Sequence, residues 1–379
     1  MSDRNHPECG FPCRAAVQPQ SGPGAGPRMH RRCCGRGGCA IAGAMTAKVL
    51  FLSDSRPGHY HQSEGAIRAL KRLVPVTVER VQVKSPGWLR GHRQRQLVSL
   101  MSFSPALALR LAHGLDLAAI ARPDIIVSAG AETMAANALL ARHFAARNIF
   151  IGSLREMAED RFSAVLAIYP SQAVRANHIL TLKPPPFEPD DLPAPQRPKG
   201  TDLAGLTAAL FVGGPSGSHS WGAADWERLE TLVRETGRAG LSWTLTNSRR
   251  TPHAASDMLQ RLAAEEPSVA GFVDIRAAGA GSAHRLFAAD ILAVTEDSAT
   301  MLMEAVAARR PVVALVPERR TATRDDEAID ALEGARRLVR LPLAEADGAR
   351  FGDAVLAGEP LAENPLDALA EKLRPVLGL

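Results

Sequence analysis

The alternation of short β-branched runs with helical patterns is the feature that most constrains the fold of this chain, and it persists from residue 48 to residue 316. Strands and helices that alternate in this way form parallel βαβ units, in which each helix crosses back over the sheet. In the first half, the expected strands are 48–53, 76–83, 124–129, 148–152 and 164–169, and the clearest helices are 63–73 and 132–147. The sequence therefore predicts an α/β protein.

A proline-rich segment divides this pattern in two. Residues 183–200 include seven prolines, and proline lacks the backbone N–H that a sheet or helix requires, so 184–200 is predicted to be an extended linker. After it, strands are expected at 207–212, 242–246, 271–274, 291–294 and 311–316, with helices at 223–238 and 299–308.

We therefore predict two Rossmann-like, doubly wound domains, since 379 residues exceed what one core usually supports. The N-terminal domain comprises residues 46–183 and the C-terminal domain 201–365. A last helix, at 366–379, is expected to pack back on the first domain. Ligands are expected in a cleft between the domains, at the carboxyl ends of the strands.

The first 45 residues differ from the rest of the chain. They contain all five cysteines, in a spacing that matches no zinc signature, and they have no hydrophobic period. The segment 1–45 is expected to be a disordered extension or a mis-assigned start, with Met45 as the initiator. Six arginines against Asp3 and Glu8 give it a charge of +4, out of +5 for the whole chain, so no nucleic-acid partner is predicted.

The composition is that of a cytoplasmic, globular protein. Apolar residues make up 46% and charged residues 22% of the chain, and no run of eighteen apolar residues occurs. The Ala- and Arg-rich composition suggests a bacterial source. The basic segment 84–95, which includes Trp88, could seat the protein peripherally on the inner face of the cytoplasmic membrane, although a solvated charged loop is the commoner explanation.

The first candidate site follows the first predicted strand. His59 is the candidate general base, because imidazole can take a proton near neutral pH, and Asp54 is the second candidate catalytic residue. Acceptor contacts are predicted from Arg56, Gly58, His61, Gln62, Gly130 and Thr133. The alternatives are a capping loop, with Ser63 as the N-cap of a helix, and an ordinary structural turn at Gly130.

The second candidate site belongs to the C-terminal half, where polar residues follow three predicted strands. Glycine backbone, hydroxyl groups and the forked guanidinium of Arg all suit a diphosphate. The predicted diphosphate-binding residues are Gly213, Gly214, Ser216, Thr246, Ser248, Arg249, Arg250, Asp297, Ser298 and Thr300. Glu304 lies about two helical turns beyond Ser298 and is predicted to accept hydrogen bonds from ribose hydroxyls. The alternatives are a solvated Arg pair, N-capping by Asp297 and Ser298, and a surface or ion-paired carboxylate at Glu304.

Four motifs resemble the mitochondrial fission ELM1-like family, named after the plant elongated-mitochondria protein. They are SDSRPGHYHQSEG, GGPSGSHSW, TNSRRTP and VTEDSATMLMEA, and they extend in order over about 250 residues. The resemblance implies a divergent fold of the glycosyltransferase-B type. The last motif is similar to the DS-x5-E pattern that binds diphosphate and ribose in that fold, matched here by Asp297, Ser298 and Glu304.

The first motif is similar in position to the glycine-histidine loop of the lipid-intermediate N-acetylglucosaminyltransferase, matched at Gly58 and His59. This chain lacks the Gly-Gly that precedes the histidine there. The plant relative is an adaptor that recruits a dynamin-like protein to the mitochondrial surface.

The predicted function is transfer of a sugar from a nucleoside diphosphate donor, without a metal ion or other cofactor. His59 would deprotonate the acceptor, while helix N-termini, glycine backbone and Arg249 or Arg250 would stabilise the leaving diphosphate. Two alternatives remain: a non-catalytic adaptor of the same fold, and a nucleotide-sugar epimerase or hydrolase.

Overall fold

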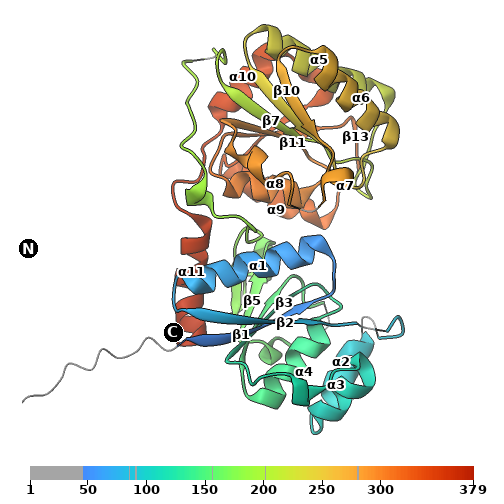
Figure 1. The fold of residues 1–379 in the computed structure, drawn as a ribbon, viewed down its shortest axis with the longest axis vertical. Helices are drawn as coiled ribbons and strands as arrows, with labels where there is room; N and C mark the ends of the chain where they lie inside the picture. The colour runs from blue at the N-terminus through green and yellow to red at the C-terminus, as the bar shows by residue number, and fades with distance from the viewer. Residues whose placement is uncertain (1–45, 85, 90–91, 156, 201, 280) are drawn as a thin grey trace, which may run out of the picture. The chain divides into compact units, whose positions relative to one another are not determined.

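The computed structural model describes residues 46–379, except 85, 90–91, 156, 201 and 280, so the prediction for 1–45 lies outside the described residues. The chain forms two six-stranded sheets with helices between the strands (Figure 1). All neighbouring strands in both sheets are parallel. The predicted α/β class and the two doubly wound sheets are confirmed.

The first sheet has the strand order β2-β1-β3-β4-β5-β6. Its strands are β1 (Ala47–Ser53), β2 (Val76–Gln82), β3 (Ile125–Ala129), β4 (Arg147–Ile151), β5 (Ala164–Ala167) and β6 (His178–Leu180). Its helices are α1 (Pro57–Lys71), α2 (His92–Leu100), α3 (Pro105–His113) and α4 (Met134–Phe144).

Successive residues of β1 serve opposite faces of this sheet, as the twofold period of a strand requires. Val49 and Phe51 pack towards α1, whereas Leu50 and Leu52 pack towards α2, α3 and α4. Figure 1 shows α1 on one face and α2, α3 and α4 on the other. Because both faces are covered, the strand is a continuous apolar run.

The second sheet has the order β10-β9-β7-β11-β12-β14. Its strands are β7 (Thr207–Phe211), β9 (Ser242–Thr246), β10 (Val269–Val273), β11 (Ile291–Thr295), β12 (Val312–Val316) and β14 (Val339–Pro342). Its helices are α5 (Ala223–Arg238), α6 (His253–Glu265), α7 (Ile275–Ala278), α8 (Ala299–Ala307), α9 (Arg324–Gly334) and α10 (Gly348–Ala357). A short antiparallel ribbon joins β8 (His219–Ser220) to β13 (Arg319–Arg320).

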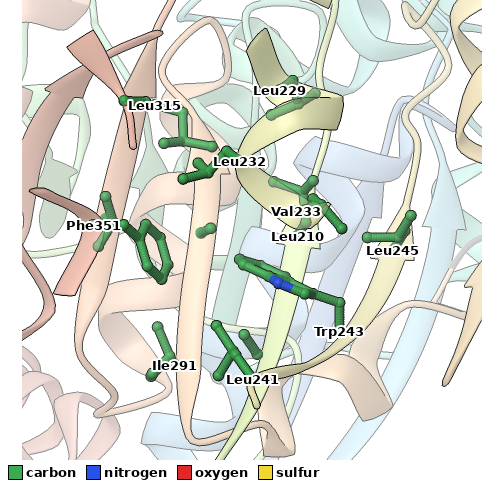
Figure 2. Close-up of a cluster of buried hydrophobic side chains, with 14 of the residues drawn as sticks. Leu210, Leu229, Leu232, Val233, Leu241, Trp243, Leu245, Ile291, Leu315 and Phe351 are labelled. Carbon is green, nitrogen blue, oxygen red and sulfur yellow. The ribbon is translucent and has the colours of Figure 1, made fainter. Parts of the chain in front are cut away.

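Trp243 on β9 lies at the centre of the core beneath α5 and α10 (Figure 2). The ring is fully buried, its centroid is 5.6 Å from that of Phe351, and its Nε1 donates to Thr236 at 2.9 Å. The hydrogen bond matters because a buried indole N–H without a partner would be costly. On the other face of the sheet, a second cluster packs against α8 and α9.

The last helix, α11 (Pro365–Leu377), packs on the first sheet rather than on the second. Asn364 caps it by accepting from the N–H of Leu366 at 2.9 Å, and Pro365 occupies the first turn, where no N–H is needed. The side chains it buries with β1 and β3 are Leu366, Leu369, Ala370, Leu373 and Leu377. In the proline-rich segment, Glu188 accepts from Asn364 at 2.8 Å and pairs with Arg72 at 2.7 Å.

One predicted boundary is corrected by the structure, and two strands are added. The helix predicted at 63–73 begins at Pro57, so the interpretation of 57–62 as part of an open loop is wrong. Ser63 as the N-cap is also wrong, because Ser63 is buried within α1. Proline is tolerated in a first turn, and its fixed φ favours helix initiation there. The strands β6 and β14 complete the sheets but were not predicted, because both are too short to show a period.

Each sheet reverses its strand order at one point. In the first sheet this topological switch lies between β1 and β3, and in the second between β7 and β11. Ligands of doubly wound sheets bind outside the carboxyl ends of the strands at such points. Both candidate sites follow these strands directly. Among the described residues, no helix combines the length and apolar character needed to cross a bilayer.

Candidate functional site

His59 and Asp54 form a hydrogen-bonded pair at the switch point of the first sheet. Asp54 follows β1, and its Oδ2 lies 2.7 Å from Nδ1 of His59, which is in the first turn of α1. The Asp54 side chain is fully buried, whereas the His59 side chain is 30% exposed. When Nδ1 carries the proton and donates to Asp54, Nε2 is the atom that can accept a proton from a ligand.

Gly130 is what allows the His59 ring to lie where it does. The residue follows β3 with φ of +87°, and a Cβ built on it would be 2.1 Å from Nδ1 of His59. Any other residue would both strain the backbone and displace the imidazole. The glycine therefore has a specific steric role beside the candidate base.

A pocket of about 210 Å³ lies beside His59. It is lined by His59, Gln62, Gly130, Ala131, Phe150, Ile151, Gly152, Ser153, Arg155, Ile168, Tyr169, Gln172 and Lys183. Of the predicted acceptor-side residues, Gln62 and Gly130 line this pocket. Its polar groups can bind hydroxyl or anionic groups of a ligand, since amides, hydroxyls and cations all surround it.

The other predicted acceptor-side residues lie elsewhere. Arg56 pairs with Glu132 at 2.6 Å, and the buried Thr133 hydroxyl donates to the carbonyls of Ala129 and Gly130. The His61 ring lies 5.4 Å from that of His284, and burial, together with Arg249, lowers its pKa. A Cβ built on Gly58 would have no contact closer than 4 Å, so there is room for a side chain at this position.

Lys183 connects this pocket to the C-terminal half. It lines the pocket with His59, and its ammonium donates to Oγ1 of Thr300, in the first turn of α8, at 2.8 Å. Burial lowers its pKa, while the charges of Asp325 and Glu304 act in the opposite sense. A lysine at the N-terminus of a helix adds to the positive end of the helix dipole, so an anion is favoured here.

Glu304 lies one turn beyond Thr300 on α8. Burial raises its pKa to about 7, against the attraction of Lys183, which lowers it. Near neutral pH the carboxyl can therefore either donate or accept a hydrogen bond. Both modes suit a sugar hydroxyl.

The glycine turn after β7 is closed by the protein's own side chains. Gly213 donates its N–H to Thr295 at 2.7 Å, and Gly214 donates to Oδ2 of Asp297 at 2.9 Å. A Cβ on Gly213 would lie 1.8 Å from that same oxygen. Arg250 donates from Nη2 to Oδ2 of Asp297 at 2.9 Å, so the Asp297 carboxylate occupies the position of an anion.

Asp297 thus binds the glycine turn and does not cap α8. Its carboxylate is buried, and burial raises its pKa despite Gly214 and Arg250. Its Oδ1 has no hydrogen-bond partner among the described residues. Ser298 is the N-cap residue of α8, but its side chain makes no capping bond to a described residue. Its hydroxyl can therefore serve a ligand.

Three of the hydroxyl groups predicted to bind diphosphate instead form hydrogen bonds within the protein. Thr246 donates to the carbonyl of Val273 at 2.8 Å, and Ser248 donates to that of Gly213 at 3.1 Å. Ser216 accepts from the N–H groups of Ser218 and His219, closing a turn. Of the Arg pair, Arg250 holds Asp297, and Arg249 is exposed to solvent.

Sequence reasoning missed Lys183, Arg155 and Tyr169. Lys183 was predicted only as the last residue of the N-terminal domain, although a lysine before three prolines is held in an extended backbone with little freedom. Arg155 follows β4 with φ of +54° and lines the pocket. Tyr169 donates to Asp325 at 2.6 Å and lies under Arg324, whose Cζ is 4.6 Å from the ring centroid. No local motif distinguishes these residues.

Metal binding was not predicted, and among the described residues no group of three or more His, Cys, Asp or Glu side chains is arranged to hold an ion.

Several solved structures align with most of the chain. The glycosyltransferase of kitacinnamycin is 16% identical with a TM-score of 0.47, and the alignment covers 87% of this chain and 96% of that one. MurG of Acinetobacter baumannii is 12% identical with a TM-score of 0.48, covering 87% and 99%. The complex of S. aureus MnaA with UDP is 11% identical with a TM-score of 0.47, covering 88% and 98%.

No curated protein sequence matches the chain. The profile of the family described as "Mitochondrial fission ELM1" matches residues 57–374, which include all the candidate residues except Asp54 and Arg56. The match extends from the first turn of α1 to α11 and so takes in both sheets. The chain therefore belongs to the mitochondrial fission ELM1 family.

Proposed function

We propose that the chain transfers a sugar from a nucleoside diphosphate donor to the hydroxyl group of an acceptor. The observation that carries this proposal is the position of Lys183, which lines the pocket of His59 and also binds Thr300 in the first turn of α8. A proton acceptor and an anion-favouring helix N-terminus thus adjoin one pocket, and a transferase of this kind needs both.

The donor diphosphate is expected at the N-terminus of α8. The first N–H groups of a helix have no partner within it, so those of the turn after Ser298 are available to phosphate oxygens. Lys183 and Arg249 supply positive charge, and Glu304, one turn further on, binds the ribose. Gly213, Gly214, Thr246 and Ser248 support this turn from behind instead of contacting phosphate, since their polar groups bind other parts of the fold.

In the reaction, Nε2 of His59 takes the proton of the acceptor hydroxyl. The acceptor oxygen forms a bond to the anomeric carbon of the sugar as the bond from that carbon to the diphosphate oxygen breaks. The nucleoside diphosphate leaves with the negative charge, stabilised by α8 and Lys183. Asp54 orients the imidazole and stabilises its protonated form.

The test separates binding from chemistry. The folded protein is screened by calorimetry against UDP, GDP, CDP, ADP, TDP and their sugars. Glu304→Ala should weaken the affinity for the nucleotide that binds, whereas His59→Ala should lower turnover about 10²- to 10⁴-fold with that affinity kept. His143→Ala, an exposed histidine at the end of α4, is the matched control and should change neither.

A non-catalytic adaptor of the same fold is the second candidate, and one observation favours it. The Asp297 carboxylate fills the glycine turn, so that turn does not present free N–H groups to a diphosphate. Failure of the folded protein to bind any of the nucleotides would support this candidate over the transferase. Consumption of the donor without an acceptor would instead indicate an epimerase or hydrolase.

A further inference from the structure

Large apolar side chains are exposed together around α2 and α3. Half of the ten large exposed apolar residues of the described chain come from this region: Trp88 (56% exposed), Leu100 (70%), Phe103 (81%), Leu107 (47%) and Leu111 (69%). Single exposed apolar residues are normal on a protein surface, but a group of them marks an interaction site.

Two of the last four share one face of α3, and the other two directly precede that helix in the chain. Leu107 and Leu111 are four residues apart on α3, so they lie on the same face, and Ala108, Leu109 and Ala112 occupy the buried face. Leu100 is the last residue of α2, and Phe103 lies in the short connection to α3. We call Leu100, Phe103, Leu107 and Leu111 the α2–α3 surface.

The segment that carries this surface contains cations and no acidic side chain. No Asp or Glu occurs between Glu79 and Asp116, a stretch that contains Lys84, Arg93, Arg95 and Arg110. Those four cations are all exposed, and Arg110, three residues after Leu107, flanks this surface on α3. From α4, Arg142 donates to the carbonyl of Ser102 at 2.6 Å, which adds a cation beside Phe103. Figure 1 shows α2, α3 and α4 together on one face of the first sheet.

We propose that the α2–α3 surface docks on an anionic lipid bilayer. Apolar side chains enter the boundary between headgroups and acyl chains, while the surrounding arginines bind anionic headgroups. Cations at a protein surface are attracted to anionic headgroups, and the segment between Glu79 and Asp116 has no acidic side chain to oppose that attraction. Charge complementarity therefore favours a bilayer over a second copy of this surface, because two copies would bring like charges together.

The test is co-sedimentation of the full chain with vesicles of phosphatidylcholine, alone or mixed with phosphatidylglycerol. The protein should bind the mixed vesicles and bind the neutral ones weakly, and added salt should weaken the binding. Phe103→Ser with Leu111→Ser should lower the partition coefficient at least about tenfold, because both side chains lose their insertion energy. Arg93→Glu with Arg110→Glu should abolish the preference for phosphatidylglycerol.

Matched controls come from the rest of the surface. Val174→Ser removes an equally exposed apolar side chain, and Arg238→Glu with Arg261→Glu makes the same charge change on α5 and α6. These controls should bind as the unaltered chain does. Since every substitution is at an exposed position, the far-ultraviolet circular dichroism spectrum of each variant should match that of the unaltered chain.

Three outcomes would overturn the proposal. Equal binding to neutral and anionic vesicles removes the electrostatic argument. If Phe103→Ser with Leu111→Ser leaves vesicle binding unchanged, another part of the chain makes the contact with the bilayer. A dimer that this double variant converts to a monomer, with no vesicle binding, assigns the surface to a second copy. None of these measurements involves a nucleotide, so they leave the proposed transferase activity to its own test.

Discussion

Glu304 is a carboxyl group whose protonation is coupled to folding. Its pKa rises from 4.5 to about 7 because burial disfavours the charged form, so the folded state holds the proton more tightly than the unfolded state. The free energy of unfolding must then fall as the pH rises from 4.5 to about 7, and the loss is complete above that range. A nucleotide that hydrogen-bonds the carboxyl would offset part of this loss.

Glu304→Gln should therefore remove this pH dependence of the free energy of unfolding, because glutamine does not titrate. We expect the variant to exceed the unaltered protein in free energy of unfolding by up to about 3 kcal/mol above pH 7, and to differ little near pH 4.5. Urea unfolding at the two ends of this range measures the difference. Glu363→Gln, at an exposed position, is the control, and parallel pH profiles for Glu304→Gln and the unaltered chain would contradict the assignment.

At the scale of elements, α11 is the last helix of the chain, yet it completes the core of the first sheet. Leu373, on α11, is fully buried against α1 and the strands of the first sheet. We expect Leu373→Ala to lower the free energy of unfolding by about 2–5 kcal/mol, through lost burial and a residual cavity. Leu356→Ala on α10, which is 42% exposed, should cost far less in the same urea titration. Equal losses in both variants would mean that α11 contributes no more than a surface helix.

The elements that could be predicted are those with a long hydrophobic period. β1 and β7 are mostly apolar runs buried on both faces, and β9 alternates Trp243 and Leu245 with hydroxyl side chains. The expected strands at 48–53, 207–212 and 242–246 match these three closely. The start of α1 could not be placed, because polar residues in a first turn look the same as a loop. Pro57 was the signal, since proline there indicates a helix beginning as readily as a turn.

At the site, residue types were predictable and their partners were not. His59 and Gly130 meet because β1 and β3 are neighbours in the sheet, and Lys183, from the proline-rich segment, lines the same pocket. The bond from Gly214 to Asp297 joins residues separated by 83 positions across the β7–β11 switch point. A single sequence does not determine the strand order of either sheet. It therefore could not reveal that the Asp297 carboxylate would bind the glycine turn after β7.

At the scale of the whole molecule, the chain gathers positive groups from three distant segments for the proposed diphosphate. These are the N-terminus of α8, Lys183 from the proline-rich segment, and Arg249 after β9, whose charge reaches His61. Together they can balance the charge that a leaving diphosphate develops. We therefore expect EDTA to leave turnover unchanged and Lys183→Met to lower it by about 10²-fold, as loss of one stabilising group in an active site does.

The comparison with Lys183→Arg makes this prediction specific. If Lys183 acts through its charge, Arg should restore part of the turnover that Met loses, although the larger guanidinium fits the Thr300 contact less well. Arg238→Met, which removes an exposed cation from the end of α5, should have no effect. Turnover that EDTA abolishes and magnesium restores would mean that a cation enters with the nucleotide, and Lys183 would then position α8 against the first sheet without stabilising the leaving group.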